Sequence, residues 1–238
     1  IKFESVYYSY PGSRKNSIED LSLYIKAKSK VGFVGSTGSG KTTSIDLILG
    51  LLRPNKGLIK IDGVNLSELN IRSWQNSIGY VPQYKYLSNS SIAENIAFGI
   101  DKTDINMNLV ERAARIANLH NYVIEDLPSG YKTIIGERGI RLSGGQTQRI
   151  IIARALYYCP DILILDEATS ALDNKTESEV MDAIELVGRR CTIVLIAHRL
   201  STIRRSDCIY EFENGRIKSS GNYKELLLKS ESFQEMIK

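Results

Sequence analysis

Apolar residues along the chain form two kinds of pattern. Short continuous runs, which are typical of buried strands, lie at residues 31–34, 78–82, 162–165 and 192–197. Stretches in which apolar residues recur every three or four positions, as on one face of a helix, lie at residues 44–52, 108–118 and 149–156. Because the runs are apolar throughout and helical stretches separate them, we predict parallel strands covered by helices on both faces.

The first residues show a different pattern. Apolar and polar side chains alternate in Ile-Lys-Phe-Glu-Ser-Val-Tyr, as they do in a strand with one exposed face. The chain begins inside this pattern, at Ile1 and without a methionine. We therefore expect either a segment of a longer polypeptide or a chain whose start has been trimmed.

Glycines gather between the first apolar run and the first helical stretch, in the segment Gly35–Thr43 with the sequence Gly-Ser-Thr-Gly-Ser-Gly-Lys-Thr-Thr. Without a Cβ in the way, the unpaired amides at the start of the following helix can surround an anion, which the helix dipole also attracts. The spacing Gly-x-x-x-x-Gly-Lys-Thr fits the phosphate-binding P-loop, in which Lys41 reaches the β- and γ-phosphates and Thr42 holds Mg²⁺. We predict nucleotide binding in preference to a flexible turn with an accidental lysine.

Each of the other apolar runs ends in a polar side chain. The residues that follow the three runs are Gln83, then Asp166 with Glu167, then His198. Ligands of parallel sheets bind beyond the carboxyl ends of the strands, so we expect these side chains to gather near the P-loop. An aspartate here is typical of Mg²⁺ coordination, Glu167 is placed to orient or deprotonate water, and His198 is placed to contact the γ-phosphate. Each also has an ordinary alternative when it is taken singly. Gln83 fits a surface loop, Asp166 with Glu167 fits a helix start, and His198 fits a structural histidine.

A second glycine-rich segment, Leu142–Gln146, precedes the last helical stretch. Ser143 and Gln146 have the spacing of a capping box, in which each side chain pairs with the backbone amide of the other residue. The glycine amides between them predict a second phosphate contact. The alternative is an ordinary capped helix start.

Composition narrows the class of protein. The 238 residues are 42% hydrophobic and 24% charged, which allows one large domain or two small ones. The net charge of +4 comes from scattered basic residues and gives little support for nucleic-acid binding. No apolar run reaches about 18 residues, so we expect neither a membrane span nor a signal peptide. Cys159, Cys191 and Cys208 lack metal-ligand spacing and are typical of reduced thiols in a cytosolic protein.

The order of these motifs resembles the nucleotide-binding domain of ABC transporters, from about Phe3 to the last helix. The resemblance assigns Walker A to Gly35–Thr42, the Q-loop to Gln83, the ABC signature to Leu142–Gln146, the end of Walker B to Asp166, the catalytic carboxylate to Glu167, the D-loop to Ser170–Asp173 and the switch histidine to His198. Thr147 departs from the family, in which arginine or lysine is commoner at this position.

ATP and Mg²⁺ are the cofactors that the resemblance implies. For ATP it implies Tyr10, as the aromatic that stacks on adenine, together with Gly35, Ser36, Thr37, Gly38, Ser39, Gly40, Lys41, Thr42, Thr43, Ser143, Gly144, Gly145 and Gln146. For Mg²⁺ it implies Thr42, Gln83 and Asp166, and for hydrolysis Glu167, His198, Lys41 and Gln83. Taken alone, Tyr10 is more typical of a tyrosine at the end of a strand.

The resemblance also implies the fold and the partners. We expect one α/β domain with a RecA-like P-loop core and an N-terminal antiparallel β-subdomain in residues 1–83 and 154–238, and an inserted helical subdomain in residues 84–153. Two such domains of this family pair head to tail, so Ser143 would act on ATP held by the P-loop of a second copy. A transmembrane domain of the same transporter would precede Ile1 and would place this domain on the cytoplasmic side of the inner membrane.

Two short segments favour the exporter branch of the family. Asn95–Gly99 resembles the exporter sequence NIAFG, and Gly136–Gly139 resembles GERG, although Ile134 and Ile135 replace its polar lead-in. No room remains for the C-terminal regulatory domain of many importers, and no heptad coiled coil is present. Ser91 and Glu94 predict a capping box at the start of a helix within the insertion.

Two other functions are compatible with the same motifs. One is a non-transport ABC ATPase that acts on DNA or the ribosome, which would need a concentrated basic face or an arm that the sequence lacks. The other is a nucleotide-binding scaffold without turnover, which the set Lys41, Asp166, Glu167 and His198 disfavours. The transported substrate cannot be predicted from these residues.

Overall fold

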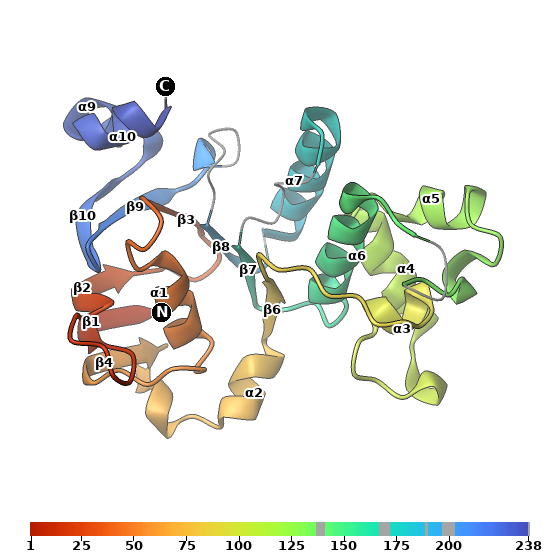
Figure 1. Cartoon of the computed structure of the whole chain (residues 1–238), viewed down its shortest axis with the longest axis horizontal. Coiled ribbons are helices and arrows are strands. Elements are labelled where there is room, and N and C mark those ends of the chain that lie inside the picture. The colour runs from red at the N-terminus through yellow and green to blue at the C-terminus, as the bar shows by residue number, and fades with distance from the viewer. Residues whose placement is uncertain (137–140, 167–171, 189, 197–202, 238) are drawn as a thin grey trace. The chain divides into compact units, whose positions relative to one another are not determined.

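The alternating N-terminal residues form a strand of an antiparallel sheet, as predicted. In the computed structural model (Figure 1), which describes residues 1–136, 141–166, 172–188, 190–196 and 203–237, this sheet has the strand order β2-β1-β4-β5. Its strands are β1 (Lys2–Tyr8), β2 (Ile18–Tyr24), β4 (Lys56–Ile61) and β5 (Val64–Asn65). Phe3, Val6 and Tyr8 are buried, but the spacing is not strictly alternating, because the register of β1 against β2 shifts between Phe3 and Val6, where Ser5 has a φ angle of 44°.

The strand that leads into the glycine segment lies between two strands from the end of the chain. It is β3 (Lys30–Val34), and it pairs in parallel with β8 (Thr192–Ile196) and with β9 (Cys208–Glu213), which pairs antiparallel with β10 (Arg216–Gly221). All five residues of β3 and of β8 are buried. The prediction of parallel buried strands is therefore confirmed for 31–34 and for 192–196, while residue 197 lies outside the described residues.

Among the described residues, five helical segments lie in the same part of the chain as β3. They are α1 (Lys41–Ile48), η1 (Leu66–Glu68), α2 (Ile71–Asn76), α9 (Tyr223–Lys229) and α10 (Glu231–Ile237). The indole N–H of Trp74 donates a hydrogen bond of 2.7 Å to the carbonyl of Ile48, which joins α2 to the end of α1. Helix α1 corresponds to the helix predicted over residues 44–52, but it begins earlier, at Lys41, and ends earlier, at Ile48.

The middle of the chain is mostly helical. Its elements are β6 (Ile78–Val81), α3 (Ile92–Ile96), η2 (Lys102–Asp104), α4 (Met107–Ile116), α5 (His120–Glu125), η3 (Gly130–Lys132), α6 (Gly144–Leu156), β7 (Ile162–Asp166) and α7 (Asn174–Gly188). The predicted capping box of Ser91 and Glu94 is present at the start of α3. Helices α3 and α4 pack on α6, around Val110, Ala113 and Ile150, none of which is exposed.

Two compact units divide the chain. The first unit consists of Ile1–Ile78 and Cys191–Lys238, and the second unit of Gly79–Arg190. The second unit includes β7 and α7 with the helices, so its bounds differ from the helical subdomain expected at 84–153, which stays a prediction. Both units mix strands and helices, which confirms the α/β class. Within the described ranges, no helix combines the length and the apolar character that crossing a bilayer requires.

Candidate nucleotide-binding site

The segment between β3 and α1 has a backbone that requires glycine. Gly35, Gly38 and Gly40 have φ angles of 140°, 78° and 109°, in the region that side chains rarely adopt. A Cβ at Gly35 would lie 2.3 Å from the carbonyl oxygen of Phe212, and a Cβ at Gly40 would lie 2.9 Å from Cδ1 of Ile18. Gly35 and Gly40 are therefore required both by the loop conformation and by the atoms packed against them, and Gly38 by the conformation alone.

Helix α1 begins at this loop without a side-chain cap. Its N-cap residue is Gly40, which has no side chain and makes no side-chain cap hydrogen bond. Ser36, Thr37 and Gly38, at the tip of the loop, are exposed to solvent. Uncapped amides and the positive end of the helix dipole favour a bound anion here. The geometry thus agrees with the predicted phosphate loop.

The ammonium group of Lys41 lies over the loop itself. It donates hydrogen bonds to the carbonyl oxygens of Gly35 (2.7 Å) and Ser36 (2.8 Å), and its Nζ lies 3.4 Å from the hydroxyl of Ser39. The Lys41 side chain is buried, so its charge is already desolvated and held next to the loop. A phosphate that enters the loop would form a charge-assisted hydrogen bond with this group in place of a carbonyl.

Tyr10 stands beside the start of α1. Its hydroxyl lies 3.3 Å from the hydroxyl of Thr43, and its ring meets the ring of Tyr8 edge to face at 5.0 Å. The Tyr10 side chain is 42% exposed, which leaves surface for a stacking base. The structure therefore brings Tyr10 and the P-loop helix together within the first unit.

Two further predicted residues of this site, Gln83 and Asp166, belong to the second unit. Gln83 is exposed and follows the end of β6, and Asp166 is buried as the last residue of β7. Glu167 and His198 lie outside the residues that the structure describes, as do Ser170 and Ala171 of the expected D-loop. The gathering of these groups around one nucleotide, and the Mg²⁺ site at Thr42, Gln83 and Asp166, stay predictions.

The second glycine-rich segment is a capped helix start, as predicted. Ser143 precedes α6; its amide donates to Oε1 of Gln146 at 2.7 Å, and the amide of Gln146 donates to the Ser143 hydroxyl at 3.1 Å. Ser143 and Gly144 are exposed. Because α6 has 13 residues, its dipole is well developed at this exposed end. The segment is therefore accessible to a ligand from outside the chain.

Sequence reasoning missed Arg154, in the last turn of α6. Its guanidinium donates to the carbonyls of Asn95 (2.8 Å) and Tyr86 (3.0 Å) and lies 4.4 Å from the ring centroid of Phe98. Burial lowers the pKa of Arg154 from its ordinary value. Arg154 therefore joins the segment after Gln83 to helix α6. The signal was an arginine inside the apolar helix sequence Ile-Ile-Ile-Ala-Arg-Ala-Leu.

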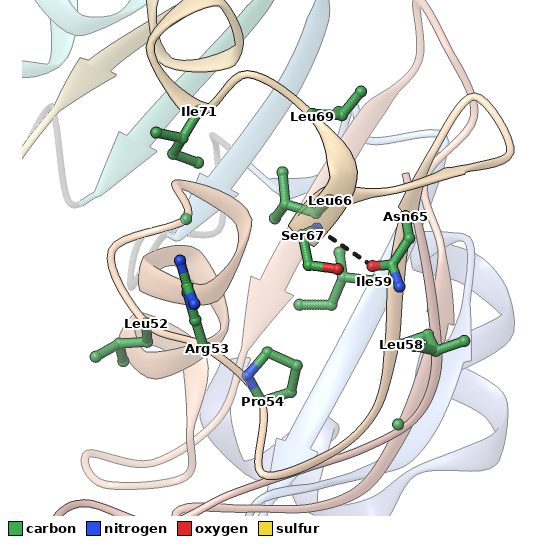
Figure 2. A pocket seen from close by; sticks show the side chains of 12 residues that line it. Leu52, Arg53, Pro54, Leu58, Ile59, Asn65, Leu66, Ser67, Leu69 and Ile71 are labelled. Atoms are coloured by element: carbon green, nitrogen blue, oxygen red, sulfur yellow. Dashed lines mark hydrogen bonds between the residues drawn. The ribbon is translucent and has the colours of Figure 1, made fainter.

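A pocket of about 420 Å³ lies in the first unit, beyond the end of α1 that is farther from the P-loop (Figure 2). Leu52, Pro54, Leu66 and Ile71 contribute apolar side chains, and Arg53 contributes a charge. None of the residues predicted to bind ATP lines this pocket. The predicted site is instead the loop at the beginning of α1.

Comparison with known proteins agrees with these motifs. The model of the ABC transporter family matches residues 18–170. The mouse protein "ATP-binding cassette sub-family B member 5" is 41% identical over 238 residues, covering 100% of this chain and 19% of that protein. The "ATP-dependent lipid A-core flippase" of Coxiella burnetii is 40% identical over 236 residues, covering 99% of this chain and 40% of that protein. The chain therefore spans less than half the length of these relatives.

A solved structure, described as a bacterial Atm1-family ABC exporter with ATP bound, has the same fold. It superposes with a TM-score of 0.92 and 38% identity, over 99% of this chain and 41% of that chain. Since the family model covers more than half of the chain and the fold matches along nearly all of it, the sequence motifs and the structure lead to one assignment. The chain belongs to the ABC transporter family, as an ATPase domain of the exporter type.

Proposed function

We propose that this chain binds ATP with Mg²⁺, hydrolyses it, and drives an exporter by pairing with a second such domain. The observation that carries the proposal is the P-loop. The positive φ angles of three of its glycines, the start of α1 at Gly40 without a side-chain cap, and the buried Lys41 side chain support an anion site here. That arrangement suits the β- and γ-phosphates of a nucleotide.

The catalytic roles follow from chemistry at the strand ends. Asp166 and Thr42, with Gln83, would hold Mg²⁺, which supplies charge stabilisation on the transferred phosphoryl group. Glu167 would orient or deprotonate the attacking water, and His198 would contact the γ-phosphate. The buried position of Asp166 at the end of β7 supports its part in this set.

A second copy of the domain would complete the site. Ser143 and Gly144 present a capped but exposed helix start, which suits an anion that another molecule holds. We propose that this surface meets the ATP on the P-loop of a facing domain, so that each ATP is bound from two sides. A single chain would then bind ATP and hydrolyse it poorly.

An exposed aromatic surface supports a partner in the membrane. Tyr84, Tyr86 and Phe98 are 87%, 64% and 49% exposed, and the rings of Tyr86 and Phe98 meet edge to face at 6.4 Å. Exposed aromatic side chains close together are typical of an interaction surface. We propose that a transmembrane domain of the same transporter contacts them, which places this domain on the cytoplasmic side of the membrane.

Steady-state ATP hydrolysis tests the proposal. The purified protein should release phosphate from ATP with Mg²⁺ and lose this activity when the metal is chelated. Hydrolysis should rise more steeply than in proportion to protein concentration if two domains must meet. Absence of hydrolysis at any concentration, despite tight ATP binding, would leave a nucleotide-binding scaffold. The proteins compared above include a lipid A-core flippase and an ABC exporter, which supports transport over action on DNA or the ribosome.

A further inference from the structure

A buried carboxylate lies one strand away from the P-loop. Glu211 belongs to β9, in the sequence Ile-Tyr-Glu-Phe, and is only 2% exposed. Burying a charged side chain costs free energy unless other groups satisfy it. The proposed hydrolysis does not use Glu211, so its surroundings require another explanation.

Three serine hydroxyls converge on this carboxylate. Ser219 of β10 and Ser230 donate to Oε2 at 2.5 and 2.6 Å, and Ser232 of α10 donates to Oε1 at 2.5 Å. Burial raises the pKa of Glu211, but the three hydroxyls together outweigh burial and leave the pKa below its ordinary value. We call these four residues the Glu211 cluster. It joins β9, β10 and the junction of α9 with α10 through one ionised group.

The Glu211 cluster adjoins the strand that enters the P-loop. Glu211 is the partner of Val34 in the parallel pairing of β9 with β3, and Val34 directly precedes Gly35. Val34 also packs with Leu226 of α9 and Phe233 of α10 in one buried cluster. Both C-terminal helices, which follow β10 at the end of the chain (Figure 1), therefore contribute to the buried cluster at the end of β3.

The hairpin of β9 and β10 also contacts the P-loop itself. The carbonyl oxygen of Phe212 would lie 2.3 Å from a Cβ at Gly35, so the two backbones are in close contact. At the turn of the hairpin, the amide of Gly215 donates a hydrogen bond of 2.9 Å to the carbonyl of Ser39. A displacement of this hairpin would therefore move both ends of the loop.

We propose that Glu211 is a positioning residue for ATP binding. By holding α9 and α10 on β9 and β10, it keeps the hairpin against the P-loop, so order in the C-terminal helices sets the affinity of the loop for the triphosphate. The inference rests on the proposed ATP site. The C-terminal helices are then a place at which a partner or a modification can regulate ATP binding without contact with the nucleotide.

Glu211→Gln tests the inference, with Glu213→Gln as the matched control. Glutamine keeps the size of the side chain but removes the charge that three hydroxyls solvate. Glu213 lies on the same strand and is exposed, with its carboxylate 2.7 Å from Nζ of Lys218. Both variants are compared with wild type at a temperature at which circular dichroism shows each to be fully folded.

Two measurements distinguish positioning from simple stabilisation. We expect Glu211→Gln to raise the Kd for MgATP about fivefold or more, as is typical of coupling between two sites, and to speed hydrogen exchange at the amides of residues 36–42. Glu213→Gln should change neither. If Glu211→Gln melts earlier but the folded protein has wild-type affinity and exchange, the positioning role is wrong.

Reciprocal coupling gives a further readout. Because linkage is mutual, MgATP should slow hydrogen exchange in α10 of wild type and should do so less in Glu211→Gln. If Glu211→Gln does not fold, Ser232→Ala removes one donor from a half-buried position and the same measurements apply. If wild type does not bind MgATP, the proposed function fails, and exchange at residues 36–42 alone decides the positioning role.

Discussion

The hydroxyl of Tyr10 lies 3.3 Å from the hydroxyl of Thr43, so the exposed aromatic ring is tied to the helix that follows the P-loop. The family resemblance implies a stacking role for Tyr10 in which only the ring matters. The structure adds a polar contact that positions the ring. If Tyr10 stacks on the base as proposed, this contact would link base binding to phosphate binding within the first unit.

Substitution of Tyr10 separates these two contributions. Tyr10→Ala should weaken ATP binding by roughly 1–3 kcal/mol through lost stacking, and Tyr10→Phe by less than about 1.5 kcal/mol through the lost hydroxyl contact. Isothermal titration with ATP measures both effects, and inorganic triphosphate, which has no base, is the control ligand. If Tyr10→Ala weakens triphosphate equally, the ring does not stack on adenine.

Removal of the loop cation should affect binding and turnover together. Lys41→Ala deletes the ammonium group that the loop carbonyls hold, and we expect a loss of ATP affinity of roughly 1.5–3 kcal/mol, as for hydrogen bonds to charged groups. Lys56→Ala, at an exposed position of β4, is the control. Unchanged hydrolysis by Lys41→Ala would refute the P-loop assignment.

Glu167→Gln should separate binding from turnover. A carboxylate beside the attacking water can accept its proton and an amide cannot, so turnover should fall by about 10²–10⁴-fold. ATP should still bind, because Lys41 and the loop amides remain. We expect an ATP-dependent dimer of this variant in sizing chromatography with light scattering. Rapid turnover by Glu167→Gln would remove Glu167 from the catalytic role.

Gln148, in α6, offers a prediction about stability. Its side chain is fully buried, and within the described chain both of its amide atoms lack a hydrogen-bond partner. Gln148→Met has a similar size and buries no unpaired polar atom, so it should raise the free energy of unfolding by about 1–3 kcal/mol. Urea denaturation measures the change. If Gln148→Met is destabilising instead, the amide has a partner in solution.

The Glu211 cluster should make stability depend on pH in acid. The pKa of Glu211 is below its ordinary value of 4.5 in the folded chain, so the unfolded chain binds this proton more tightly. The ionised carboxylate of Glu211 therefore contributes fully to the free energy of unfolding above pH 4.5, and this contribution is lost as the pH falls through the lower pKa of the folded chain. Thermal melting from pH 6 downward should show a smaller acid-induced loss in Glu211→Gln than in wild type. If wild type and Glu211→Gln lose equal thermal stability in acid, Glu211 does not contribute to the pH dependence.

Local features of the site were predictable from the sequence, and long-range ones were not. The glycines at Gly35 and Gly40 and the capping box at Ser143 follow from the preferences of adjacent residues, so their geometry agrees with the prediction. Glu211 lies between Tyr210 and Phe212 in β9, and the hydroxyls that explain its burial lie 8 to 21 residues later along the chain. Arg154 was missed for the same reason, since its acceptors lie 59 and 68 residues away.

Strand β3 has a consequence for how the protein is made. Its two partners, β8 and β9, lie more than 150 residues further along the chain, as the pairing of Val31 with Val194 and with Cys208 shows. Contacts so distant in sequence form late, and synthesis proceeds from the N-terminus. On the ribosome, the phosphate loop emerges before β8 and β9. The strand that precedes the loop therefore lacks both of its partners until these later strands have left the exit tunnel. A nascent or prematurely terminated chain would therefore carry the motif without a working ATP site.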